Sequence, residues 1–142
     1  MASNTDPEFP FEKILQISKS ALTNSYSPYS KFSVAATLFT EDGKMFTGVN
    51  VENASFGLTM CAERTAIGAA VSHGYRKFKA IMVVTGSKGE EYIGPCGACR
   101  QVLAEFGTDW DVYICNKENK YRKCTVSELL PHAFTPDSLK GS

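Results

Sequence analysis

Two short stretches of this sequence carry residue types that could hold a metal ion and move a proton. One contains Cys61 and Glu63, and a later one contains Cys96 and Cys99. Thiols are soft ligands, and three of them suit a zinc ion that keeps its fourth position open for water. A carboxylate that is not a ligand supplies the acid–base partner that such a water needs. The two stretches together therefore indicate a hydrolytic zinc centre.

The spacing of these residues restricts how they can meet. Cys61 and Glu63 are two apart, so in the body of a helix they would point to different faces. They can share a site only from the first turn of a helix whose axis is aimed at the metal. Cys96 and Cys99 are three apart and share a face, and Pro95 before them suits a helix entry. We therefore expect two helix N-termini to converge on one ion, each adding partial positive charge.

The chemistry available to such a centre is hydrolysis. Zinc lowers the pKa of bound water from near 16 towards roughly 7. Glu63 would take the proton of that water and then pass protons to a ring nitrogen and a departing amine. This sequence of proton transfers is hydrolytic deamination. Arg64, together with the helix dipoles, would offset the negative charge of three thiolates.

Two other interpretations of the cysteines remain open at this level. A Cys-x-x-Cys pair is also typical of dithiol redox proteins, although these require neither Cys61 nor Glu63. A closed structural zinc site needs a fourth protein ligand. The candidates are Cys115, Cys124, His73 and His132.

The elements that must position these residues follow from hydrophobic periodicity and turn residues. We expect helices over residues 9–25, 60–73 and 96–106, and a short helical turn at 127–130. We expect strands over residues 32–40, 45–52, 79–85, 110–115 and 121–125. The first two strands form a hairpin, and the apolar run 79–85 is typical of an interior parallel strand. The expected fold class is α/β, a three-layer α/β/α sandwich with a mixed five-stranded sheet.

Length and composition set the broad class of protein. A chain of 142 residues is expected to form one domain over 1–142, with residues 1–8 as a flexible arm. Its 15 basic residues balance its 15 acidic ones, which argues against a nucleic-acid partner. No apolar run approaches a membrane span, and no signal pattern is seen at the N-terminus. Five cysteines, an odd number, favour a reducing compartment, so we expect a cytosolic protein.

The two stretches also resemble a known family. Cys61-Ala62-Glu63 and Pro95-Cys96-Gly97-Ala98-Cys99 resemble the zinc signature of cytidine deaminases, in their three-cysteine, homotetrameric branch. The likeness covers nearly the whole chain after the N-terminal arm. Its further blocks are Tyr29 to Val34, Asn50 to Ala54, Cys61 to Ala66, Pro95 to Val102, and Glu128 to Pro131 followed by Phe134.

The resemblance implies a reaction and a set of site residues. One Zn²⁺ per subunit would be held by three thiols, with Glu63 as the proton shuttle, converting cytidine and 2′-deoxycytidine to uridine and 2′-deoxyuridine. Phe32 would stack on the pyrimidine, and Asn50 and Glu52 would hold the ribose 3′-hydroxyl. Backbone near Ala62 would contact the base, and Arg64 would hydrogen-bond the ligand thiolates. The implied metal ligands are Cys61, Cys96 and Cys99.

The resemblance also implies a homotetramer with shared active sites. Ala54 and Phe56 fall where family members approach a neighbour's pocket, and Phe134 falls where a C-terminal aromatic closes an adjacent site. Gly68, in an apolar helix, would permit close approach of another backbone. One departure concerns Phe56-Gly57, where several relatives have Tyr-Pro. A hydroxyl contact and a stiff turn are therefore missing at this position.

Other functions are compatible with parts of the pattern. A blasticidin-type aminopyrimidine antibiotic deaminase has a similar zinc framework, but Asn50, Glu52 and Phe134 favour a nucleoside substrate. An editing deaminase acting on RNA or DNA would be expected to carry a basic arm, which this neutral chain lacks. A non-enzymatic zinc module would have no need of Glu63.

Overall fold

The computed structural model describes residues 8–86 and 91–140, so most of the arm expected at 1–8 lies outside the described residues. Its helices are α1 (Phe11–Ala21), α2 (Ala62–Ser72), α3 (Gly97–Glu105), α4 (Val126–Leu129) and α5 (Pro136–Leu139). Two single 3-10 turns are η1 (Leu22–Asn24) and η2 (Phe56–Leu58). The strands are β1 (Val34–Thr40), β2 (Met45–Val49), β3 (Phe78–Thr85), β4 (Asp111–Cys115) and β5 (Tyr121–Thr125).

The five strands form one sheet in the order β2-β1-β3-β4-β5. β1 runs antiparallel to both β2 and β3, while β3 is parallel to β4 and β4 is antiparallel to β5. The prediction of a mixed five-stranded sheet is confirmed. β3 is interior, as expected, but only its pairing with β4 is parallel.

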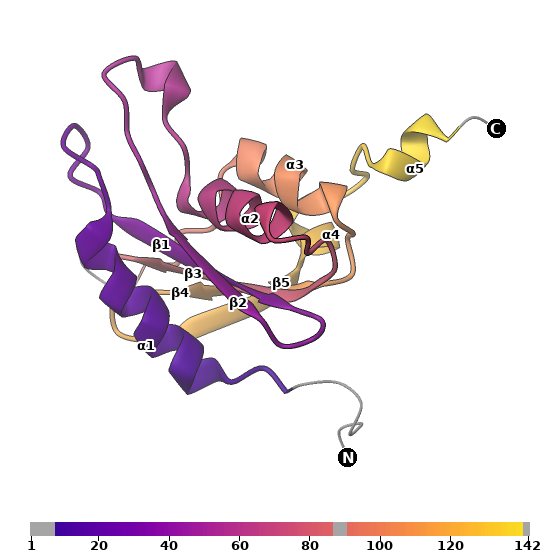
Figure 1. Cartoon of the computed structure of the whole chain (residues 1–142), viewed down its shortest axis with the longest axis horizontal. Helices are drawn as coiled ribbons and strands as arrows, with labels where there is room; N and C mark the ends of the chain where they lie inside the picture. The colour runs from indigo at the N-terminus through magenta and orange to yellow at the C-terminus, as the bar shows by residue number, and fades with distance from the viewer. Residues whose placement is uncertain (1–7, 87–90, 141–142) are drawn as a thin grey trace.

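Helices cover both faces of this sheet (Figure 1). Successive side chains of a strand point to opposite faces, so β1 contributes to two separate cores. Ala35 and Phe39 pack with Ile14 of α1, whereas Ala36 and Leu38 pack with the apolar face of α2 and with α3. The predicted three-layer α/β/α sandwich is therefore confirmed.

Helix α2 lies directly on β2 because Gly48 has no side chain. A Cβ at Gly48 would lie 2.5 Å from the backbone N of Ala66 and 2.7 Å from the carbonyl O of Ala62. Among the described residues of this single chain, no backbone lies close to Gly68, so an approach by the backbone of a neighbouring subunit stays a prediction. Gly68 is exposed, and no atom lies within 4 Å of the position its Cβ would take. The close contact thus belongs to the glycine in the strand.

Two boundaries near the two cysteine-containing stretches differ from the sequence prediction. α2 begins at Ala62 rather than at residue 60, and its N-cap is Cys61. β2 ends at Val49 rather than at residue 52. Val51 instead forms isolated bridges to Tyr26 and Met60, so the chain after β2 leaves the sheet. The short helix α5 was not predicted.

Candidate metal centre

The predicted site residues meet at one end of the sheet. A cavity of about 230 Å³ lies there. It is surrounded by the start of β1, the end of β3, the residue after β2 and the N-termini of α2 and α3. The segment before α3 closes another side. The cavity is lined by Phe32, Val34, Asn50, Thr59, Cys61, Ala62, Glu63, Val83, Thr85, Ile93, Gly94 and Cys96.

Three thiols lie together at the N-terminal ends of α2 and α3. Cys61 is the N-cap of α2, Cys96 is the N-cap of α3, and Cys99 lies in the first turn of α3. Their sulfur atoms all lie within 4.8 Å of one another, and the Sγ atoms of Cys61 and Cys96 are 3.8 Å apart. The expected convergence of two helix N-termini is therefore confirmed.

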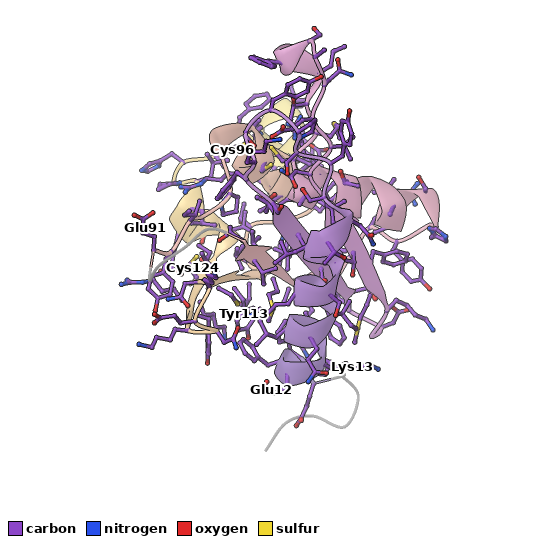
Figure 2. The ribbon with its side chains drawn as sticks, turned by 90° about the vertical axis from the view of Figure 1, so that its left-hand side faces the viewer. Glu12, Lys13, Glu91, Cys96, Tyr113 and Cys124 are labelled. Carbon is purple, nitrogen blue, oxygen red and sulfur yellow. The ribbon has the colours of Figure 1, made fainter. Side chains whose placement is uncertain are left out.

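The donor set fits a zinc ion with an open position. Three soft sulfur donors at this spacing match zinc's preference for thiolates, and the positive helix ends favour the thiolate form. Over residues 8–86 and 91–140, no further His, Cys, Asp or Glu joins the group. Cys115 is buried in the core beneath α1, and Figure 2 shows Cys124 well apart from Cys96. Neither of the two remaining cysteines can therefore complete a closed site.

The thiols differ in how easily they ionise. The pKa of Cys61 is lowered to about 5, first because Cys99 donates a hydrogen bond to it and next because Arg64 does. The pKa of Cys99 is raised, because it gives that hydrogen bond and because it is buried. Of Cys61 and Cys99, Cys61 is thus the thiol that ionises more readily.

Arg64 links this sulfur to the preceding loop. Its Nη2 lies 3.5 Å from the Cys61 sulfur and 3.4 Å from the carbonyl oxygen of Thr59. Its Nε atom is buried and has no hydrogen-bond partner among the described residues. A guanidinium in this position can stabilise negative charge on Cys61, and the role that the resemblance implies for Arg64 towards all the ligand thiolates stays a prediction.

Glu63 projects into the cavity from the first turn of α2, as the spacing required. Only 4% of its surface is exposed. Burial raises the pKa of its carboxyl group, and the negative charge of Cys61 adds to the effect, while its own backbone N–H and Arg64 oppose it. A buried carboxyl with a raised pKa beside a cluster of thiols is well suited to holding and releasing a proton.

Asn50 holds the segment that carries Phe32. Its Oδ1 accepts hydrogen bonds from the backbone N–H of Val34, at 3.0 Å, and from the Ser25 hydroxyl. Its Nδ2 donates to the carbonyl oxygen of Phe32 at 2.8 Å. Asn50 is only 7% exposed, so these bonds fix its amide in one orientation.

Glu52 lies in a neighbouring hollow rather than in the cavity of the thiols. This hollow, of about 310 Å³, is lined by Tyr29, Ser30, Glu52, Phe56 and Thr59. The expectation that Asn50 and Glu52 alternate along a strand is wrong, because β2 ends before both. The two hollows share Thr59 in their walls.

The other predicted contacts divide between buried and exposed positions. Ala62 is fully buried and lines the cavity, whereas Ala54 is exposed. Phe56 is 73% exposed and Phe134 is 59% exposed, and neither lines the cavity of the thiols. The carbonyl oxygen of Phe134 accepts a hydrogen bond from Gln101 Nε2 of α3 at 2.8 Å.

Several residues that line the cavity were not predicted from the sequence. Val83 and Thr85 end β3, and Ile93 and Gly94 belong to the segment before α3. The end of a buried strand is a common place for site residues, so β3 offered a signal. The segment at 93–94 has no periodicity, and only its closeness to Cys96 marked it.

Comparisons of this chain with known proteins all find deaminases. The family described as "Cytidine and deoxycytidylate deaminase zinc-binding region" matches residues 10–115. A cytidine deaminase of Sporosarcina psychrophila is 47% identical over 129 residues, covering 90% of this chain and 93% of that protein. A blasticidin-S deaminase of Bacillus cereus is 30% identical over 129 residues, covering 87% and 91%.

A solved structure agrees with these sequence matches. The crystal structure of cytidine deaminase from Burkholderia pseudomallei superposes with a TM-score of 0.83 at 46% identity, covering 89% of this chain and all of that one. Shared sequence, shared fold and a three-thiol cluster at two helix ends all point the same way. This chain belongs to the cytidine and deoxycytidylate deaminase zinc-binding family.

Proposed function

We propose that this chain catalyses the hydrolytic deamination of cytidine and 2′-deoxycytidine to uridine and 2′-deoxyuridine, with release of ammonia. The observation that carries the proposal is the buried Glu63 beside three clustered thiols in one cavity. The named relatives at 46–47% identity are cytidine deaminases, which supports the substrate.

Cys61, Cys96 and Cys99 would hold one Zn²⁺ per subunit. When bound there, zinc supplies a Lewis acid that brings the pKa of water close to neutrality. Glu63 would accept one proton from the attacking water and pass it to the pyrimidine ring nitrogen. It would then accept the remaining proton, from the hydroxyl group added to the ring carbon, and deliver it to the departing amine as the C–N bond breaks. Its buried position excludes solvent from these transfers.

Phe32 and Ala62 are proposed to bind the pyrimidine. Both line the cavity, where the ring of Phe32 offers an apolar face for stacking. The backbone near Ala62, in the first turn of α2, has N–H groups that no helical carbonyl accepts. These groups suit the polar edge of a base.

Asn50 and Glu52 are proposed to hold one hydroxyl of the sugar. Both lone pairs of Asn50 Oδ1 and one Nδ2 hydrogen are already used, which leaves one N–H without a partner among the described residues. Glu52 accepts three hydrogen bonds from residues that the structure describes, and these leave one of about four acceptor positions. One remaining donor and one remaining acceptor match a single hydroxyl, which can accept from Asn50 and donate to Glu52.

A homotetramer with shared sites is proposed from the incomplete cavity. Its volume of about 230 Å³ is below the roughly 300–1,000 Å³ of complete small-molecule sites. The exposed residues Ala54, Phe56 and Phe134 would add the missing walls from neighbouring subunits.

We also propose a role in pyrimidine salvage within the cytosol. Within the described residues, no helix is long and apolar enough to cross a membrane.

Two variants test the reaction and the metal ligands. Glu63→Gln removes the proton acceptor, so we expect cytidine turnover, followed by loss of absorbance, to fall at least about a hundredfold. Cys99→Ala removes one ligand, and metal analysis is expected to find zinc lost. Near-normal turnover by Glu63→Gln would refute the mechanism, and retained stoichiometric zinc in Cys99→Ala would refute the ligand set.

The second candidate function is deamination of an aminopyrimidine antibiotic. It is favoured only by the 30% identity to a blasticidin-S deaminase. Comparing kcat/KM for cytidine and blasticidin S on the same zinc-loaded protein decides between the two. We expect cytidine to be preferred because the free donor of Asn50 and the free acceptor of Glu52 match a sugar hydroxyl.

A further inference from the structure

The hydroxyl of Ser30 connects two residues of the proposed substrate site. It donates a hydrogen bond to Oε2 of Glu52 and accepts one from the backbone N–H of Phe32 at 3.0 Å. Ser30 does not line the cavity that holds the thiols, whereas Phe32 does. Ser30 therefore acts on that cavity only through its neighbours.

The segment between Ser30 and Phe32 has a conformation that needs support. Lys31 has a φ of 61°, in the left-handed region that side chains other than glycine adopt at an energetic cost. Its backbone N–H donates to the carbonyl oxygen of Ser27 at 3.0 Å. The bonds of Ser30 and Asn50 to Phe32 then hold the backbone on the other side of Lys31.

Glu52 anchors this turn. Its Oε1 accepts the backbone N–H groups of Tyr29 at 3.0 Å and Ser30 at 3.1 Å, so three of its bonds come from two consecutive residues. The pKa of Glu52 is lowered, first by the Ser30 hydroxyl, then by these backbone N–H groups and by the positive charge of Lys31. The carboxylate is thus held ionised by the turn that it holds.

We propose that Ser30 is a positioning residue that fixes both the free acceptor of Glu52 and the backbone that presents Phe32 to the cavity. This inference rests on the proposed function, because Glu52 and Phe32 are assigned there to sugar and base. The hydroxyl occupies one lone pair of Oε2, so only the other faces the ligand. The same oxygen stops the Phe32 N–H from turning to solvent.

The test compares three variants of the zinc-loaded protein. In Ser30→Ala both hydrogen bonds are lost, and we expect the KM for cytidine to rise about tenfold while kcat stays within about threefold. Ser30→Thr restores a hydroxyl and should recover most of the KM. Ser20→Ala, an exposed serine of α1, is the matched control and should leave both constants unchanged.

The pH dependence of kcat/KM separates positioning from a general loss of stability. Removing a donor that lowers the pKa of Glu52 must raise that pKa. The acidic limb that reflects protonation of Glu52 should therefore move to higher pH in Ser30→Ala and return in Ser30→Thr. A variant that is merely less stable would not show this movement.

Amide hydrogen exchange tests the link without any substrate. Exchange of the Phe32 amide should accelerate in Ser30→Ala and not in Ser20→Ala. An unchanged Phe32 exchange rate, or an unchanged KM in an active protein, would overturn the proposal. If the wild-type protein does not turn over cytidine, the proposed function fails, and the exchange measurement alone decides whether Ser30 holds Phe32.

Discussion

A single side chain can serve both the fold and the site, and Asn50 does so here. It is buried, and its amide joins Ser25, Phe32 and Val34, which come from the segment leading into β1. Within the described part of the chain, these partners leave one N–H of the amide for a ligand. The same bonds that hold the backbone therefore determine which atom of Asn50 faces the cavity.

Asn50→Ala is expected to lose both stability and substrate affinity. The Val34 N–H and the Phe32 carbonyl would be left without their partner, which should lower the free energy of unfolding by about 2–4 kcal/mol. The KM for cytidine should rise as well. Urea unfolding and steady-state kinetics measure the two effects, and exposed Asn24→Ala is the control. A free energy of unfolding equal to that of the Asn24 variant would contradict the role of Asn50 in holding the backbone at Phe32 and Val34.

At the scale of elements, the position of α2 depends on its contact with β2. Gly48 lets the backbone of the helix lie against the strand, and this places Cys61 and Glu63 at the cavity. The nearest atoms to a Cβ at Gly48 belong mainly to backbone, which cannot move aside as a flexible side chain can. The helix and the strand would have to separate.

Gly48→Ala and Gly68→Ala should therefore act in opposite directions. Gly48→Ala overpacks the contact and should lower the free energy of unfolding by about 3 kcal/mol. Gly68→Ala replaces an exposed glycine within the helix and should raise it by about 0.5–1 kcal/mol. Urea unfolding measures both. If both variants changed the free energy of unfolding equally, the position of α2 would not depend on Gly48. If Gly68→Ala instead lowered the stability and the particle mass, a neighbouring subunit would lie against Gly68.

At the scale of the whole molecule, large exposed apolar side chains gather on two neighbouring segments, 26–29 and 51–60. The rings of Tyr29 and Phe56 lie 5.7 Å apart, and bridges join Val51 to Tyr26 and Met60. Figure 1 shows the segment around η2 projecting from the sheet. Such a patch favours association with another protein surface. The exposed residues are Tyr26, Tyr29, Val51, Phe56, Leu58 and Met60.

The proposed tetramer predicts complementation between two defective chains. Phe134→Ala keeps Glu63, and Glu63→Gln keeps Phe134, so subunit exchange should restore Phe134 to working sites. We expect the mixture to exceed the summed activities of the separate variants. Light scattering should give four times the 15.5 kDa subunit mass.

Leu58→Asp places a charge on the exposed apolar surface and should reduce both the particle mass and the activity. Full activity of a monomer would exclude shared sites.

Residue type and short-range spacing determined the metal centre and the fold class. The two-residue separation of Cys61 and Glu63 allows a shared site only at a helix start, because deeper in a helix the side chains diverge. Periodicity likewise predicted the strands and the long helices. The spacing at each helix start and the periodicity of each element depend on geometry within that element, whereas the meeting of Cys61 with Cys96 and Cys99 also depends on how α2 and α3 pack.

Only the tertiary structure decided how separate segments meet. β2 ends before Asn50 and Glu52 because Val51 leaves the sheet to pair with Tyr26 and Met60. Nothing in the spacing of Asn50 and Glu52 indicates these distant pairings. Likewise, the sequence did not indicate that Gly48 lies against the backbone of α2, since this contact depends on how the strand and the helix dock. The chemistry of the thiols was thus readable from the sequence, whereas the shape of the substrate site depends on contacts between distant residues.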